Sequence, residues 1–312
     1  MLRPPPLKFV PYYPITAGVS AAAIVVTGLW WSGQNIDAFT MNTDVWSRWQ
    51  LWRALTATLP HVNFFHLAFN LYWVWTFGTL VERVYGHLKC AGIFLLLAFG
   101  SSLADFALSS GGVGLSGVGY GLWGLLMVLE QRDARFADAV DRQTNQLFIF
   151  WFFLCIVLTI INVMPVANVA HGAGAVLGIL LGLAVAGKLS VRWPSRAGLT
   201  ALMILILLGA TVFWPKANFS SDAEAQVEHD GLEALDRGDV PHAVKLLEVS
   251  AHMRNAPARA WYNLGVACLQ ADRYSDALAA FKHAAQMPDA DSQMRRALQD
   301  MESHSTETGT NQ

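Results

Sequence analysis

Long runs of apolar residues without charge dominate the first 215 residues of the chain. Seven runs approach or reach the roughly 20 residues that a helix needs to cross the hydrocarbon core of a bilayer. They cover residues 13–31, 64–81, 90–108, 115–129, 147–164, 168–187 and 198–214. The fourth run is short unless its helix continues past the charged residues that follow it. The pattern predicts an all-α fold, a polytopic bundle of transmembrane helices.

The composition changes near Lys216. Eight of the 23 acidic residues precede it, so 15 follow it. We therefore expect a membrane part and a soluble α-helical part. The predicted division is a six-helix membrane domain at 1–190, a seventh transmembrane helix at 191–216, a helical repeat domain at 217–302 and a disordered tail at 303–312.

Residues 222–300 repeat their pattern at a spacing of 34, so that Gly231 matches Gly265 and Leu247 matches Phe281. This pattern resembles the tetratricopeptide repeat, in which small residues let two antiparallel helices pack closely. Two copies are fewer than a stable solenoid usually needs. One interpretation is a module that binds a protein or peptide partner, and the other is a helical tail that packs only on itself.

Lysine and arginine residues predict the orientation. With a cytoplasmic N-terminus, the inside segments carry ten of them and the outside loops carry only Arg48 and Arg53. This asymmetry follows the positive-inside rule. Seven crossings then place the C-terminal repeat domain outside. We expect a multi-pass integral membrane protein of a bacterial inner (plasma) membrane.

Charge and cysteine content exclude other classes. Charged residues make up 14% of the chain, against roughly 25% in ordinary soluble domains. The net charge of −2 offers no basic surface, so we expect no nucleic-acid partner. The three cysteines lie far apart and have no metal-ligand spacing. We expect neither a metal nor a cofactor.

Polar residues inside membrane spans are costly, and four of them stand out as candidates for function: His66, Asn70, Ser116 and His171. In the predicted topology, the second, fourth and sixth spans all enter from the outer side, so these residues share a shallow depth. An imidazole can take the proton of a serine hydroxyl. Two further donors can stabilise an oxyanion. This set of side chains is typical of acyl transfer.

Glycines strengthen this interpretation. Gly114 and Gly117 let the backbone turn tightly around Ser116. Gly174, Gly178 and Gly182 recur at every fourth position of the sixth span and give it a smooth face. Small faces let two membrane helices approach closely. We expect this approach to bring Ser116 and His171 within reach of each other.

Four separated motifs, in this order and on these spans, resemble the rhomboid family of intramembrane serine proteases: Trp52-Arg53, His61-x4-His66-x3-Asn70, Gly114-x-Ser116-Gly117-x-x-Tyr120-Gly121 and Ala170-His171-x-x-Gly174. The resemblance covers roughly residues 12–190. It implies a six-helix catalytic core that cleaves peptide bonds in or near transmembrane segments of membrane proteins. The seventh helix and the repeat domain are additions to that core.

The resemblance also implies roles for single residues. Ser116 is the expected nucleophile and His171 the general base. His66 and Asn70, with the Ser116 amide, would form the oxyanion hole, and Tyr120 would stack on the His171 ring. The remaining implied roles are structural: His61 as support, Trp52-Arg53 in an embedded loop, and Glu82 at the inner end of the second span.

Alternative readings stay open at this stage. A rhomboid-like protein without activity could bind and escort membrane clients. A channel or transporter is disfavoured, because the sequence has no repeated half and no ring of charges. The uninterrupted aromatic fifth span, Phe148 to Met164, is a hypothetical lateral gate for substrate. Asp105 is interpreted as a solvated loop residue without a role.

Overall fold

The computed structural model describes residues 4–254 and 256–309, in which every regular element is a helix. The chain divides into two compact units, Met1–Asn218 and Phe219–Gln312. The division lies two residues beyond the boundary expected from composition. Each unit has its own packed interior, and each is described by itself below.

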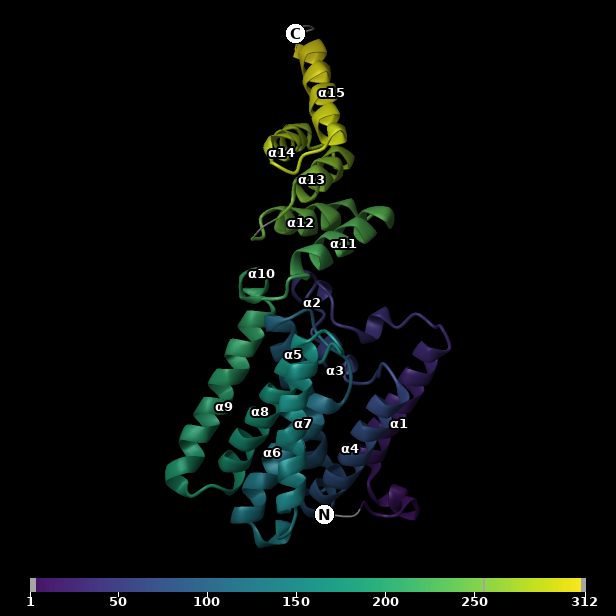
Figure 1. The fold of residues 1–312 in the computed structure, drawn as a ribbon. Helices are drawn as coiled ribbons and strands as arrows, with labels where there is room; N and C mark the ends of the chain where they lie inside the picture. Colours follow the sequence, from purple (N-terminus) through teal and green to yellow (C-terminus); the bar gives the residue numbers. More distant parts are fainter. Residues whose placement is uncertain (1–3, 255, 310–312) are drawn as a thin grey trace. The chain divides into compact units, whose positions relative to one another are not determined.

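Unit 1 contains seven long helices that run alternately up and down (Figure 1). They are α1 (Pro14–Trp31), α4 (Phe64–Tyr85), α5 (His87–Leu108), α6 (Ser116–Arg132), α7 (Arg142–Ile160), α8 (Asn168–Ala186) and α9 (Leu189–Ala210). Short helices fill the connections: η1 (Leu7–Tyr12), η2 (Asp37–Phe39), α2 (Asp44–Ser47), α3 (Arg53–Thr56), η3 (Ala134–Phe136) and α10 (Trp214–Ala217).

Five of the long helices in the described part of the chain are long and apolar enough to cross a membrane: α1, α5, α7, α8 and α9. The other two fall short for different reasons. Helix α6 has only 17 residues, and the polar residues His66 and Asn70 lower the mean hydropathy of α4. Five candidate spans support a helical membrane bundle, and the count of seven crossings stays a prediction.

Several helix boundaries differ from those of the apolar runs, and α6 and α9 are two of them. Helix α6 continues past its charged flank to Arg132. Helix α9 begins at Leu189, two residues before the predicted seventh helix at 191–216 and nine residues before its apolar run at 198. The basic residues that precede the apolar run lie within this helix, and Arg196 Nε donates to the carbonyl oxygen of Ala184 near the end of α8 at 3.2 Å. Basic side chains commonly satisfy the last carbonyls of a helix in this way.

Helices α6 and α8 make the closest approach in unit 1, and glycines make it possible. A Cβ atom added at Gly174 would collide with the carbonyl oxygen of Gly117, and one added at Gly178 would collide with that of Gly121. The obstacle in both cases is backbone, which no side-chain rotation can move. The glycine face predicted for the sixth span is therefore the surface on which α6 packs.

Glu82 joins α4 to the beginning of α1. Its carboxylate accepts hydrogen bonds from the Ile15 and Thr16 N–H groups, each at 2.9 Å, and from the Thr16 hydroxyl at 2.7 Å. His87 Nδ1 lies 2.7 Å from the same carboxylate. A carboxylate that receives the unpaired N–H groups of a helix N-terminus stabilises that end. This geometry supports the structural role expected for Glu82.

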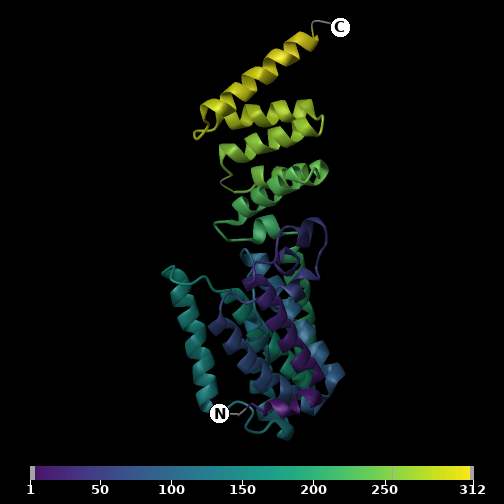
Figure 2. The ribbon, with the colours of Figure 1, turned by 90° about the vertical axis from the view of Figure 1, so that its right-hand side faces the viewer.

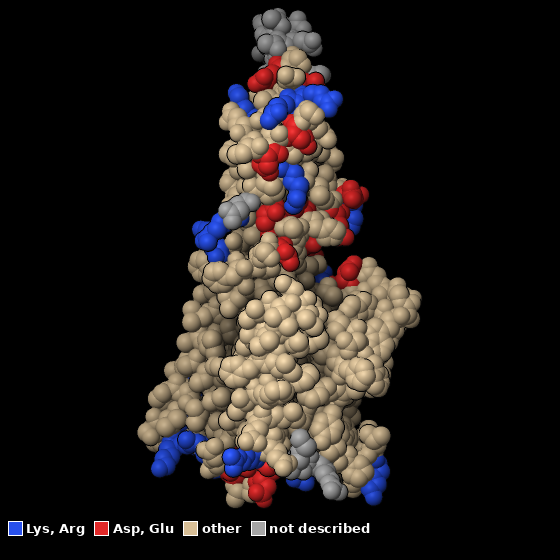
Figure 3. All heavy atoms as spheres, viewed as in Figure 1, with Lys and Arg blue, Asp and Glu red and all other residues tan. Residues whose placement is uncertain are grey.

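Charge is distributed unevenly over unit 1. On the face shown in Figure 3, lysine and arginine gather at the lower end of this unit, and the broad middle shows no charged residues. The α4–α5, α6–α7 and α8–α9 connections lie at the same lower end in Figure 1. These are the connections that the positive-inside pattern assigned to one side of the membrane. The first residues of α4, α6 and α8 lie at the opposite end.

Unit 2 consists of stacked helices: α11 (Ala223–Asp236), α12 (Val240–Ala251), α13 (Ala258–Gln270), α14 (Tyr274–Gln286) and α15 (Ser292–Gly309) (Figure 2). Matching residues make matching contacts in the two hairpins. A Cβ at Gly231 would lie 2.9 Å from Leu247 Cγ, and one at Gly265 would lie 2.6 Å from Phe281 Cε1. Two equivalent helical hairpins are thus present, and the tetratricopeptide assignment stays a prediction.

Disorder of the tail at 303–312 stays a prediction, and part of that segment is described as helix. Helix α15 continues to Gly309, and residues 310–312 lie outside the described residues. No glycine or proline interrupts the sequence between Ser292 and Thr308, so nothing in the backbone chemistry stops the helix earlier. Leu298 and Met301 of α15 pack against the core of unit 2 and hold this part of the helix in place.

Candidate active site

The side chains of Ser116 and His171 meet at one end of unit 1. Ser116 is the first residue of α6, and His171 lies in the first turn of α8. His171 Nε2 is 2.8 Å from Ser116 Oγ. His171 is buried, with 4% of its surface exposed, whereas Ser116 is half-buried. An imidazole in this position can take the hydroxyl proton and convert the serine into a nucleophile.

Tyr120 covers one face of the His171 ring. The two ring centroids are 4.6 Å apart and the ring planes differ by 24°. The Tyr120 hydroxyl donates to the backbone oxygen of Phe148 on α7 at 3.1 Å. His171 Nδ1 is buried and has no hydrogen-bond partner among the residues that the structure describes. The imidazole is therefore held by Ser116, by the Tyr120 ring and by the placement of α8.

Gly114 shapes the loop that leads to Ser116. Its φ of +111° belongs to the region that glycine adopts readily and other residues rarely. A Cβ at this position would lie 2.7 Å from His66 Cε1. The Gly114 N–H donates to the Ala57 carbonyl oxygen at 3.1 Å. The loop thus passes directly against the His66 ring, and only glycine fits there.

His61 supports the same loop through both ring nitrogens. Its Nε2 accepts from the Leu115 N–H at 3.2 Å, so the ring proton is on Nδ1, which donates to the Leu59 carbonyl oxygen at 2.9 Å. Burial, followed by the neighbouring His66, lowers the pKa of His61 to about 3, which keeps the ring neutral and able to accept. This geometry supports a structural role for His61.

His66 and Asn70 lie one turn apart on the same face of α4. The Asn63 side chain caps this helix by accepting from the His66 N–H at 2.9 Å. The Asn70 amide group donates one hydrogen to the His66 carbonyl oxygen at 2.9 Å, which leaves its second hydrogen for another acceptor. His66 contacts the Gly114 loop, whereas the described bond of Asn70 stays within α4. The oxyanion role of Asn70 therefore remains a prediction.

The long loop between α1 and α4 is organised around Arg53. Its side chain is buried, with Nε donating to Gln50 Oε1 at 2.7 Å. One terminal nitrogen donates to the carbonyl oxygens of Asp37 and Thr40. The guanidinium carbon lies 5.1 Å from the ring centre of Trp52, which is 47% exposed. These contacts support the structural role expected for Trp52-Arg53.

The prediction that Asp105 is a solvated loop residue is wrong. Asp105 lies in the last turn of α5, is 2% exposed, and accepts a hydrogen bond from the Ala170 N–H at 3.2 Å. The sequence did not reveal that this end of α5 packs against α8. One signal was available, since an ionisable residue inside an apolar run is costly unless it has a partner.

Helix α7 is only slightly enclosed by its neighbours. Figure 2 shows it standing apart from the other long helices over most of its length. Only 17% of its most apolar window is buried, against 61% for α5. Phe148, near its first residue, packs on Tyr120 and Trp123 with ring centroids 5.2 and 5.3 Å apart. Contacts continue along the helix, because Trp151 lies 5.3 Å from Phe69 between ring centroids and Thr159 Oγ1 accepts from Asn168 Nδ2 at 2.8 Å. Helix α7 thus keeps contacts along its length although little of its surface is buried.

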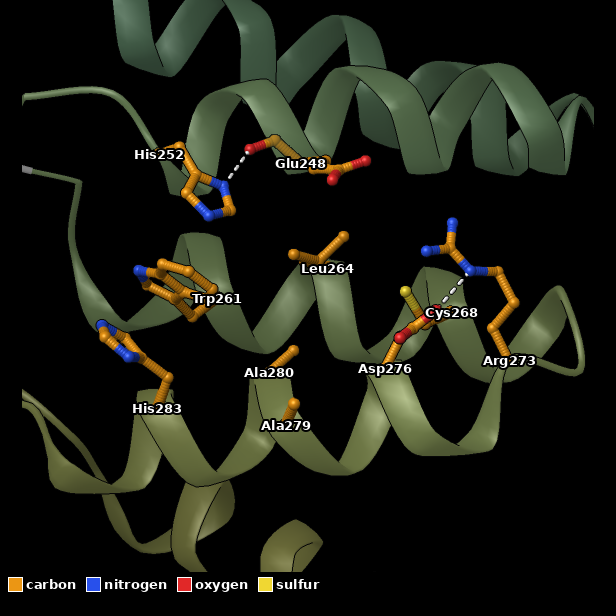
Figure 4. Close-up of a pocket in the computed structure, with 10 residues that line it drawn as sticks. All are labelled: Glu248, His252, Trp261, Leu264, Cys268, Arg273, Asp276, Ala279, Ala280 and His283. Carbon is orange, nitrogen blue, oxygen red and sulfur yellow. Dashed lines mark hydrogen bonds and ion pairs between the residues drawn. The ribbon is translucent and has the colours of Figure 1, made fainter.

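Unit 2 carries a separate groove of about 300 Å³ between α12, α13 and α14 (Figure 4). Trp261 lies between His252 and His283, with ring centroids 4.7 and 4.0 Å away. At the other end of the groove, Arg273 Nε donates to Asp276 Oδ2 at 2.6 Å. The groove therefore combines an aromatic surface with a charged pair.

Comparisons with known proteins point to one family. The Rhomboid domain family model matches residues 48–188, the part of the chain that contains Ser116 and His171. The chain is 27% identical over 240 residues to Rhomboid protease GluP of Bacillus subtilis (strain 168), covering 75% of this chain and 45% of that protein. The matched stretch is longer than unit 1, so the match continues into unit 2.

Two further relatives match over shorter stretches. Rhomboid protease GlpG of Serratia proteamaculans (strain 568) is 33% identical over 178 residues, 54% of this chain and 61% of that protein. Rhomboid-like protease 1 of Toxoplasma gondii is 29% identical over 172 residues, 53% of this chain and 58% of that protein. The chain thus spans about half the length of these relatives. The family match and the named relatives support the rhomboid family for the membrane part of this chain.

Proposed function

We propose that this protein is an intramembrane serine endopeptidase that uses a Ser116–His171 pair. The observation that carries the proposal is the 2.8 Å distance between Ser116 Oγ and His171 Nε2 on two closely packed helices. The relatives named as proteases support the same reaction class. A serine and an imidazole in contact have the minimum composition for nucleophilic acyl transfer.

The mechanism uses groups already in place. Ser116 Oγ attacks a peptide carbonyl carbon, and His171 Nε2 takes the hydroxyl proton and passes it to the leaving amine. Water then hydrolyses the acyl-enzyme, with His171 acting again as base. The Ser116 N–H, His66 and Asn70 are the proposed donors to the oxyanion. Tyr120 keeps the imidazole aligned through both steps.

We propose transmembrane segments of other proteins as the substrates, with entry past α7. The low burial of α7 and its position apart from the other long helices in Figure 2 support this entry route. A cysteine cross-link between α7 and α4 should abolish cleavage of transmembrane substrates. The same cysteine pair left uncross-linked is the control, and unchanged cleavage after cross-linking would rule out this entry route.

Reconstitution tests the main proposal. In liposomes that contain a transmembrane substrate, the wild-type protein should cleave the substrate and be labelled by a serine-directed fluorophosphonate. Ser116→Ala should do neither, and His171→Ala should lose nearly all turnover. Asn70→Ala should lose about 10²- to 10³-fold in kcat, the range for one oxyanion donor. A Ser116→Ala variant that still cleaves would overturn the proposal.

The alternative is an inactive rhomboid-like protein that binds membrane clients. The presence of both Ser116 and His171 in contact favours the protease, because client binding requires no such contact. The same assay separates the two functions. Client capture without cleavage or labelling would establish the alternative.

For unit 2 we propose that the groove beside Trp261 binds a protein or peptide partner. The aromatic surface and the Arg273–Asp276 pair supply both apolar and polar contacts (Figure 4). Trp261→Ala in the full chain should alter the cleavage of some substrates and leave others unchanged. A chain shortened after residue 215, assayed on the same substrates, tests whether unit 2 recruits them. Equal rates on every substrate would contradict recruitment.

We also propose a bacterial inner membrane with a cytoplasmic N-terminus and unit 2 on the outside. The lysines and arginines at one end of unit 1 support this orientation (Figure 3). Reporter fusions after α4, α6 and α9 test it. A cytoplasmic signal after α9 would reverse the assignment of unit 2.

A further inference from the structure

The carboxylate of Asp105 lies where three segments of unit 1 meet. It belongs to the last turn of α5, and its Oδ1 accepts from the Ala170 N–H at 3.2 Å. The loop that leads to Ser116 passes beside the other oxygen. A Cβ at Gly112 would lie 3.3 Å from Asp105 Oδ2 and 2.5 Å from Ala167 Cβ. Asp105 therefore lies against both segments that carry the proposed pair, the start of α8 and the loop before Ser116.

The end of α5 is itself held firmly. Trp214 Nε1 donates to the Phe106 carbonyl oxygen at 2.8 Å, and Asn218 Nδ2 donates to the Ser109 carbonyl oxygen at 2.6 Å. The Ser109 hydroxyl donates to the Asp105 carbonyl oxygen at 2.8 Å. Trp214 is completely buried and stacks on Phe106, with ring centroids 5.2 Å apart. The last turn of α5 thus offers a fixed point from which Asp105 can act.

The partner of Asp105 is a main-chain group that the helix cannot satisfy. The first N–H groups of an α-helix have no acceptor within the helix. Ala170 is the third residue of α8, and its N–H points at the Asp105 carboxylate. An acceptor from another helix satisfies this N–H group, which would otherwise be buried without a partner. It fixes the position of the first turn of α8, and His171 is the next residue.

We propose that Asp105 is a positioning residue for the Ser116–His171 pair. It acts through the Ala170 amide and sets where the His171 ring meets the serine hydroxyl. The kinetic part of this inference rests on the proposed proteolytic function. Glu82 is the matched comparison, because it is also a buried carboxylate that receives helix N-terminal N–H groups, but at the other end of the bundle.

The test uses three variants of the full chain in liposomes. Asp105→Leu removes the acceptor at similar volume, and kcat should fall about 10- to 100-fold with little change in KM, since a misplacement of about 1 Å can cost that much. Asp105→Asn keeps an oxygen for the Ala170 N–H and should restore kcat to within about fivefold of wild type. Glu82→Gln should lower the melting temperature without lowering kcat.

Hydrogen exchange gives a readout that does not depend on proteolysis. In Asp105→Leu, the peptide that contains residues 168–174 should exchange faster, while peptides from α4 should be unchanged. Normal exchange there, or a kcat equal to wild type at matched folding, would overturn the inference. A wild-type protein that neither cleaves nor binds fluorophosphonate would instead refute the proposed function, and the exchange result would still decide whether Asp105 holds α8.

Discussion

Replacing Gly174 by alanine should disable the protein by separating α6 from α8. The added Cβ would lie 3.0 Å from the carbonyl carbon of Gly117 and closer still to its oxygen, whereas ordinary contact begins at 3.4 Å. Backbone atoms cannot rotate out of the way, so α8 must move by on the order of 1 Å. Gly117 is the residue directly after Ser116, and Gly174 lies about one helical turn after His171. The movement of α8 therefore changes the distance between the proposed Ser116–His171 pair.

The magnitude follows from the distance between Ser116 Oγ and His171 Nε2. A movement of about 1 Å takes the 2.8 Å contact between Ser116 and His171 beyond hydrogen-bonding range. A misplacement of this size costs about 10²-fold in rate. Overpacking of a close helix contact also costs about 1–3 kcal/mol in stability. Gly174→Ala should therefore lose about 100-fold in kcat and melt at a lower temperature.

Gly119→Ala is the matched control on α6. No atom lies within 4 Å of a Cβ at this position, so the methyl group meets open space. Alanine favours a helix over glycine by about 1 kcal/mol, so the control should be at least as stable as wild type and equally active. The assay is cleavage of a transmembrane substrate in liposomes, with fluorophosphonate labelling measured in parallel. A Gly174→Ala rate within twofold of the control would refute the argument from helix separation.

Three further outcomes are expected. Tyr120→Phe keeps the ring on His171 but loses the bond to the Phe148 carbonyl oxygen, so kcat should fall less than about tenfold, measured beside a Tyr120→Ala variant that should lose far more. Arg53→Leu removes a buried guanidinium and leaves loop carbonyl oxygens without donors, so the melting temperature should fall with a cost of about 1–3 kcal/mol. Arg259→Ala removes the charged partner of the buried Glu228 carboxylate, bound at 2.6 Å, and leaves it the Asn263 amide as a donor. The variant should destabilise unit 2 in denaturant melts while leaving proteolysis of a minimal transmembrane substrate unchanged.

The approach of Ser116 to His171 could be anticipated from the sequence because it depends on residue type at regular spacing. Glycines at every fourth position of one span leave a face without side chains, and the structure uses that face for the contact with α6. Gly114 could be anticipated for a similar reason, since a tight turn before the serine needs a residue without a Cβ. Patterns of this kind encode backbone distance directly.

Helix ends were harder to anticipate. The apolar run of the seventh span begins at 198, yet α9 begins at Leu189 and includes the basic residues before that run. Arg196 in this segment donates to the Ala184 carbonyl oxygen on another helix, a contact that local composition does not encode. Composition is also a poor guide to the length of α4. Its polar residues lower its mean hydropathy, although the helix has a full 22 residues.

His171 Nδ1 has no acceptor among the described residues, so other contacts must fix the orientation of the imidazole ring. In a triad, a carboxylate fixes the imidazole through that nitrogen. Here the ring is fixed by stacking on Tyr120 and by the height and spacing of α8 itself. Residues that fix the position of α8, such as Gly174, therefore orient the imidazole, a role that a third polar side chain has in a triad. Asp105 is a similar case, because it accepts a hydrogen bond from a main-chain N–H group. Such a contact does not require a particular residue type next to the histidine, so no sequence motif could reveal it.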